Sequence, residues 1–147
     1  MRAYERLLKY ARVYTTSDPN SGTHPSAERE FDLAHILVED MKAIGIEDAF
    51  VDEHCYVYGT SRHPGCEDKP ALGLIAHMDT APDASGENVN PILHENYDGR
   101  DVTLPATGTV MKVSTFPFLK DLKGETLITT DAPRCWVPTT RPVWRRS

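Results

Sequence analysis

The stretch ALGLIAHMDT, residues 71–80, decides the fold prediction. It begins with an uninterrupted apolar run over residues 71–76, which has the length of a strand and is too short for a helix. Both faces of such a strand would be buried, and this is typical of a central strand in an α/β sheet. The polar residues that follow, His77 and Asp79 among them, would then lie at the carboxyl end of the strand, where open α/β sheets bind ligands.

His77 and Asp79 are two residues apart, and in extended backbone this spacing places both side chains on one side of the chain. The Asp79 carboxylate can then accept a hydrogen bond from one ring nitrogen of His77 and leave the other nitrogen free for a metal ion. A second interpretation is a local hydrogen-bonded pair at a strand end, with Asp79 opening the turn before Pro82. Because a zinc site takes three or four ligands, usually from several segments, this motif supplies one ligand and its carboxylate partner.

Helical periodicity occurs twice before this stretch. Residues 1–14 place apolar side chains at i, i+3, i+4 and i+7 and predict an amphipathic helix. A second helix is predicted to begin after a cap at Thr23 or Ser26 and to end before Gly45. Shorter elements are predicted as strands at 49–51, 55–58 and 127–130 and as one helical turn at 116–122, with irregular chain beyond residue 82. These elements predict an α/β fold with a central strand at 71–76.

The composition limits the classes of function. The 147 residues include 22 acidic and 16 basic side chains, three cysteines and no apolar run longer than residues 71–76. A membrane span needs roughly 20 apolar residues, and the charged start MRAYER has no signal-peptide core, so we expect a cytoplasmic protein with no membrane partner. Without a broad basic surface we expect no nucleic-acid partner. Three cysteines without CxxC spacing are typical of reduced thiols.

Four segments, taken in order, resemble a known family. They are THPS at 23–26, AHMDTAPDASGENVNP at 76–91, HENYDG at 94–99 and GETLITTD at 124–131. Over residues 1–131 the chain resembles the N-terminal part of the peptidase T family, the tripeptide aminopeptidases among the M20 zinc metallopeptidases. Because AHMDTAPDASG and LITTD are specific to this tripeptidase branch, another M20 activity such as a carboxypeptidase or a deacylase is disfavoured.

The resemblance implies a partial zinc-peptidase catalytic domain, with a central mixed sheet flanked by helices and without its lid domain. By this resemblance His77 matches a zinc ligand, and Asp79 matches the active-site aspartate that orients the imidazole of that ligand. Enzymes of the family use two zinc ions bridged by an aspartate and a water, with a glutamate as general base, and they release the N-terminal residue of tripeptides. The bridging aspartate, the base and the other ligands have no match in this chain, so we expect at most a weak, partial zinc site. The sequence indicates no oligomeric state.

Residues 132–147 form a second part that resembles nothing in the family. Residues 1–131 carry all 22 acidic and 12 of the basic side chains, whereas the tail carries four arginines and no acid. The tail also contains both tryptophans and three of the eleven prolines, and its apolar residues follow no helical or strand period. We therefore expect the tail to pack poorly, because proline blocks helix and central-strand hydrogen bonding.

A single-base deletion accounts for this tail. In the family, LITTD continues into a sequence such as GTTLLGADDKAGVAEI. Written in suitable synonymous codons and read after the loss of one G, that sequence becomes APRCWVPTTRPVWRR followed by serine, which is the sequence of residues 132–147. We therefore expect a frameshifted, truncated form of a family enzyme, inactive by itself. The competing hypothesis is a non-catalytic remnant or a binding module recruited by another protein.

Overall fold

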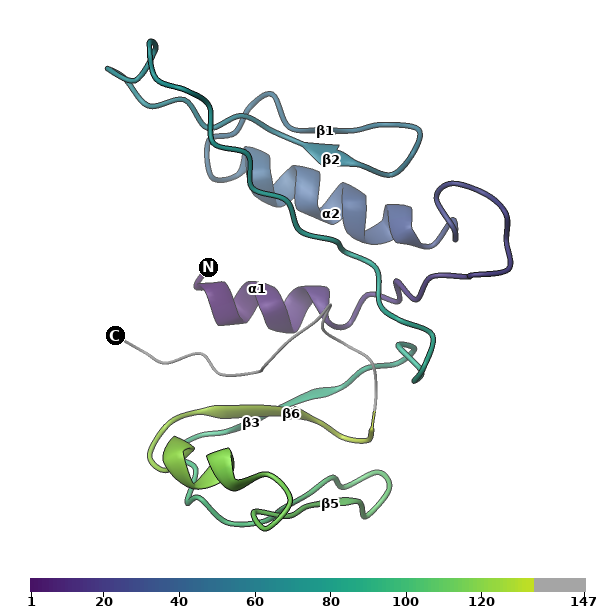
Figure 1. The fold of residues 1–147 in the computed structure, drawn as a ribbon, viewed down its shortest axis with the longest axis vertical. Coiled ribbons are helices and arrows are strands. Elements are labelled where there is room, and N and C mark those ends of the chain that lie inside the picture. Colours follow the sequence, from purple (N-terminus) through teal and green to yellow (C-terminus); the bar gives the residue numbers. More distant parts are fainter. Residues whose placement is uncertain (134–147) are drawn as a thin grey trace.

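A computed structural model describes residues 1–133 of the chain. Within these residues, α2 lies beside β1 and β2, with α1 on the other side of α2, whereas the remaining strands and the short helix η1 form a second group (Figure 1). The expectation that residues 132–147 pack poorly falls, apart from the first two, outside the described residues. The elements in chain order are α1 (Ala3–Tyr10), α2 (Glu30–Lys42), β1 (Phe50–Val51), β2 (Val57–Tyr58), β3 (Pro91–His94), β4 (Val102–Thr103), β5 (Val110–Met111), η1 (Pro117–Leu122) and β6 (Leu127–Thr130).

Both predicted helices are present, but each is shorter than the stretch of sequence in which apolar residues recur at helical spacing. α1 ends at Tyr10, and α2 begins only at Glu30, with Arg29 before it and no side-chain hydrogen bond that caps it. The Ser26 hydroxyl donates to Glu30 Oε1 at 2.7 Å and accepts from the backbone N–H of Asp18 at 3.0 Å. The predicted cap at Thr23 or Ser26 is therefore wrong. Gly45 has the expected left-handed backbone, with φ of 94°.

The small sheet formed by β1 and β2 packs against α2. The two strands pair antiparallel, with Phe50 opposite Tyr58, and both contact α2. The chain passes so close to the helix that a Cβ placed on Gly59 would lie 2.4 Å from Cε of Met41. A larger residue would have to displace the end of the Met41 side chain and Cγ2 of Ile46, so glycine allows this close approach.

The second group has its own apolar core under a longer sheet. β3 and β6 pair antiparallel over four residues, with His94 opposite Leu127, and β4 pairs antiparallel with β5. The strand at 127–130 and the helical turn near 116–122 confirm the sequence predictions, whereas β3 lies in the region expected to be irregular. The buried side chains of this core are Tyr97, Val102, Leu119, Leu122 and Leu127.

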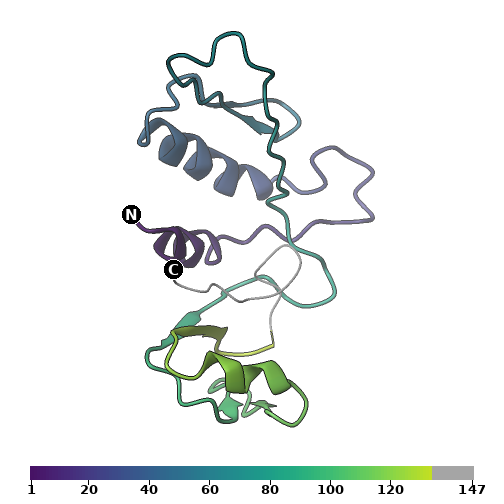
Figure 2. The same ribbon diagram turned by 60° about the vertical axis from the view of Figure 1, so that its left-hand side comes forward.

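The predicted central strand at 71–76 is not formed in this structure. The segment runs past α2 toward the second group in both views (Figures 1 and 2), and Leu72, Leu74 and Ile75 are 85%, 89% and 100% exposed. A strand forms when a neighbouring strand pairs with its N–H and C=O groups. Within residues 1–133 no strand lies beside this segment, and the predicted central mixed sheet is replaced by three two-stranded antiparallel sheets. The structure of these residues is thus a small mixed α/β arrangement of short strands.

A polar contact joins α1 to α2. Lys9 Nζ donates to both carboxylate oxygens of Asp40 at 2.8 and 2.9 Å, and the Tyr10 hydroxyl donates to Oδ2 at 2.7 Å. The hydrogen bonds from Lys9 and then Tyr10 lower the pKa of Asp40 from its ordinary 3.8. Burial, followed by the hydrogen bond to Asp40, raises the pKa of Tyr10 to about 12. The ionised carboxylate is thus the form that the folded chain favours.

Asp40→Asn is expected to lower the free energy of unfolding at neutral pH by about 1 kcal/mol, since it removes charge-assisted hydrogen bonds at a partly exposed site. Because the folded-state pKa of Asp40 lies below 3.8, this contribution is complete above the unfolded pKa and is lost as the pH falls through the folded value. Urea unfolding of both proteins near pH 7 and in acid measures it. The exposed Glu39→Gln on the same helix is the control, and a difference that persists unchanged in acid would contradict the assignment.

Candidate functional site

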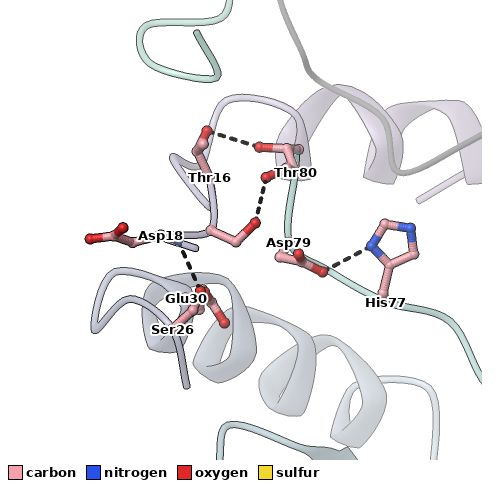
Figure 3. A network of polar contacts seen from close by, with 8 residues as sticks. Thr16, Asp18, Ser26, Glu30, His77, Asp79 and Thr80 are labelled. Atoms are coloured by element: carbon pink, nitrogen blue, oxygen red, sulfur yellow. Dashed lines mark hydrogen bonds and ion pairs between the residues drawn. The ribbon is translucent and has the colours of Figure 1, made fainter. Parts of the chain in front are cut away.

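His77 and Asp79 form a hydrogen-bonded pair at the end of the exposed segment. Nδ1 of His77 lies 2.9 Å from Oδ1 of Asp79 (Figure 3), and the side chains are 48% and 37% exposed. This confirms that the spacing places both side chains on one side, although no strand is formed there. An ionised carboxylate only accepts hydrogen bonds, so in the neutral imidazole the proton lies on Nδ1 and Nε2 keeps its lone pair. The pair can therefore present one oriented nitrogen ligand.

Thr80 fixes the position of this pair against the loop that follows α1. Its N–H donates to the carbonyl of Thr15 at 3.1 Å, and its carbonyl accepts from the N–H of Ser17 at 3.0 Å and from the hydroxyl of Ser17 at 3.1 Å. The buried hydroxyls of Thr16 and Thr80 lie 3.0 Å apart (Figure 3). These contacts form a single parallel bridge between the loop and the end of the segment. The anchored Thr80 limits how far Asp79 and His77 can move.

The loop itself is attached to the start of α2. Arg29 Nε donates to the carbonyl of Thr16 at 2.8 Å, and its guanidinium lies 4.5 Å from the ring centroid of Tyr14. Together with the Ser26 bonds described above, these contacts connect α2, the loop and the segment that carries His77. Sequence reasoning missed this connection, because a bridge of one residue pair leaves no periodicity in either segment.

A large cavity lies beside the pair. It has a volume of about 1030 Å³ and is formed by α1, the loop after it, α2, β2 and residues 74–80. Its lining is mainly apolar and includes Leu33, Met41 and Val57, whereas His77 and Asp79 are among its polar residues. A mainly apolar hollow with a few polar groups is the common form of a binding site in proteins.

The other histidines have identifiable local contacts. His94 Nε2 lies 2.9 Å from the hydroxyl of Thr129 across the sheet of β3 and β6, and the ring of His35 stacks on Phe31. His24 and His54 line the cavity, and their ring centroids are 5.4 Å apart. Within residues 1–133 no three His, Cys, Asp or Glu side chains are grouped so that they could hold a metal ion. His77 therefore fits one position of a zinc site, but the described residues do not supply the rest.

Cys55 and Cys66 are free thiols, and Cys135 lies outside the described residues. Burial, followed by the negative charge of Glu30, raises the pKa of Cys55 to about 11. Such a thiol stays protonated near neutral pH and is a poor nucleophile or metal ligand. Cys55 is therefore an apolar side chain of the packing around α2 and not a catalytic group.

No helix in the described part of the chain is long and apolar enough to cross a membrane. No family model matches the chain. Peptidase T of Alkaliphilus oremlandii is 48% identical over 130 residues, which are 86% of this chain and 32% of that protein. Peptidase T of Geobacillus kaustophilus is 48% identical over 128 residues, and that of Clostridium perfringens strain 13 is 43% identical over 130 residues.

These matches include most of this chain but only part of the relatives. The aligned residues are 86% of this chain for Geobacillus kaustophilus and 88% for Clostridium perfringens, yet the chain spans about a third of the length of the relatives, 31% and 32% of these two proteins. The extent of the match is consistent with an N-terminal segment of peptidase T. The chain is therefore a homologue of peptidase T, related to it over about one third of that protein's length.

Proposed function

We propose that this chain carries the His77–Asp79 part of a zinc-dependent tripeptide aminopeptidase of the peptidase T type, which releases the N-terminal residue of tripeptides in the cytoplasm. The observation that supports this most is the 2.9 Å hydrogen bond between Nδ1 of His77 and Oδ1 of Asp79 in a homologue of peptidase T. In the proposed site His77 Nε2 is a zinc ligand, and Asp79 orients the ring and increases its basicity.

The proposed reaction needs more residues than the described part of the chain provides. Zinc held by a complete ligand set lowers the pKa of a bound water and polarises the scissile carbonyl. Residues 1–133 contain no group of three side chains that could hold the ion, so no step of the reaction is assigned to them beyond orienting one ligand.

We also propose that residues 1–131 are the peptidase part and that residues 132–147 are a frameshift product. Resequencing the DNA across the codons for Thr130 to Pro133 tests the frameshift.

The second candidate is a non-catalytic chain, either a remnant or a binding module. The exposed apolar residues of segment 71–76 and the incomplete ligand set within residues 1–133 favour it. A different M20 activity, such as that of a carboxypeptidase or a deacylase, is a weaker candidate because the relatives that the chain matches are peptidase T proteins.

The purified 147-residue chain, supplied with zinc, is expected to hydrolyse tripeptides no faster than its His77→Ala variant. A two-metal site acts as a unit, and the loss of one member typically removes orders of magnitude of rate. Because His77 is about half exposed, the variant is expected to keep the fold, and circular dichroism of both proteins checks this. Tripeptidase activity of the short chain that depends on His77 would contradict the prediction and would mean that the site is completed by residues assigned here to loops.

A further inference from the structure

Two histidines from different segments, His24 and His54, lie together among the residues that line the cavity. His24 belongs to the loop between α1 and α2, and His54 belongs to the turn between β1 and β2. Their ring centroids are 5.4 Å apart, and the ring of Tyr56 lies 5.2 Å from that of His24 and 6.5 Å from that of His54. Neither histidine has a part in the site proposed around His77.

The spacing of the two imidazoles fits a shared metal ion. A histidine nitrogen binds a divalent ion such as Zn²⁺ at about 2.0–2.1 Å, which places the centroid of its ring about 3.2 Å from the ion. Two imidazoles on one tetrahedral ion therefore have centroids about 5.2 Å apart, close to the 5.4 Å between His24 and His54. Both residues are exposed, so each ring can turn one nitrogen toward the ion without displacing a packed neighbour.

The backbone that carries each histidine is held by hydrogen bonds. Oδ1 of Asp52 accepts from the N–H groups of His54 and Tyr56 at 3.0 and 2.8 Å, and the N–H of Asp52 donates to the carbonyl of Tyr56 at 3.0 Å. The loop that carries His24 is held by the two hydrogen bonds of the Ser26 hydroxyl described above. Since both segments are already ordered, an ion that joins them has less conformational entropy to overcome.

Carboxylates surround the pair and favour a cation. Oε1 of Glu53 lies 3.8 Å from Nε2 of His54. After burial, the negative charges of three carboxylates contribute to the raised pKa of the neighbouring Cys55 thiol, those of Glu30, Asp52 and Glu28. Negative charge on several sides attracts a cation and partly offsets the loss of its water ligands.

We propose that His24 and His54 bind a divalent transition-metal ion of the Cu²⁺, Ni²⁺ and Zn²⁺ class, with water at its remaining positions. Imidazole nitrogen suits these ions, and the affinity is highest for Cu²⁺. Within residues 1–133 no third His, Cys, Asp or Glu completes the group, so the ion is held reversibly. It links the loop between α1 and α2 to the turn between β1 and β2. His77 is not a ligand, so the proposal does not depend on peptidase activity.

Calorimetric titration of the 147-residue chain with Cu²⁺ near neutral pH, together with electron paramagnetic resonance of the bound ion, tests the proposal. All proteins carry Cys66→Ser and Cys135→Ser, so that neither thiol reacts with copper. The resonance is expected to show two nitrogen ligands at the tightest site. His24→Ala and His54→Ala are each expected to weaken that site at least about tenfold, since even the loss of a ligand's hydrogen-bond partner costs about 10- to 100-fold.

Three further variants separate metal binding from ring packing and from other histidines. His24→Phe keeps a ring beside Tyr56 but has no nitrogen, so it is expected to weaken the site as His24→Ala does. Circular dichroism checks that each variant keeps the fold. His77→Ala and His63→Ala are expected to leave the site intact, because His77 is not grouped with the pair and His63 is an exposed loop histidine.

Several outcomes would overturn the proposal. Unchanged Cu²⁺ binding in His24→Ala, His54→Ala or His24→Phe would show that these nitrogens do not hold the ion. A resonance with a single nitrogen ligand would mean that separate histidines bind copper one at a time. An equal loss in His77→Ala would assign the ion to the pair of His77 and Asp79, and an equal loss in His63→Ala would show non-specific binding.

Discussion

His77→Ala in the full-length protein that reversal of the proposed frameshift would give is expected to reduce the proposed zinc-dependent tripeptide hydrolysis by about a thousandfold or more. In this chain the Nδ1 atom of His77 is hydrogen-bonded to Asp79, so Nε2 of His77 is the atom available to a metal. Removal of the imidazole leaves the ion with one ligand fewer and leaves Asp79 without its partner. The measurements are the rate of release of N-terminal residues and the zinc content of the purified protein, both of which should fall.

Asp79→Asn in the same enzyme is expected to have a smaller effect, about 10- to 100-fold on activity or zinc affinity, because it removes the carboxylate that orients the ligand and keeps the ligand itself. The matched control is His63→Ala, since His63 is an exposed loop histidine whose ring contacts the carbonyl of Pro64. Near-normal activity of the His77→Ala enzyme, or an equal loss in the His63→Ala enzyme, would refute the assignment of His77 as a ligand.

Leu119→Ala is expected to lower the free energy of unfolding by about 3 kcal/mol. Leu119 is completely buried among Tyr97, Val102 and Leu127, in the core beneath the sheet of β3 and β6. Truncation removes buried methyl groups and leaves a cavity, and both effects add to the cost. Because small domains are stable by only about 5–15 kcal/mol, this is a large part of the total.

The control for this prediction is Leu74→Ala, because Leu74 is 89% exposed in the short chain. The same change of side chain is expected to alter the free energy of unfolding by less than about 0.5 kcal/mol there. Denaturant unfolding, followed by circular dichroism, compares the two variants. Similar losses for both would mean that Leu74 is buried in solution and that the free chain covers its segment 71–76.

The sequence by itself determined the features that arise from neighbouring residues. The helical periods over residues 1–14 and over the stretch before Gly45 predicted α1 and α2, although both helices are shorter than predicted, since one apolar stripe is enough to define an amphipathic helix. The strand at 127–130 followed from its β-branched residues. The contact of His77 with Asp79 followed from a spacing of two residues and needs no sheet to form.

The tertiary structure alone decided which segments pair. β3 was missed because its pairing with β6 joins residues 91–94 to residues 127–130 across a region without periodicity. The bond between Thr16 and Thr80, 64 residues apart, could not be predicted for the same reason. Conversely, the apolar run at 71–76 has the composition of a central strand, but its composition does not provide the neighbouring strand with which it would have to pair. A strand forms only where another segment satisfies its backbone donors and acceptors, and residues 1–133 place no such segment beside this run.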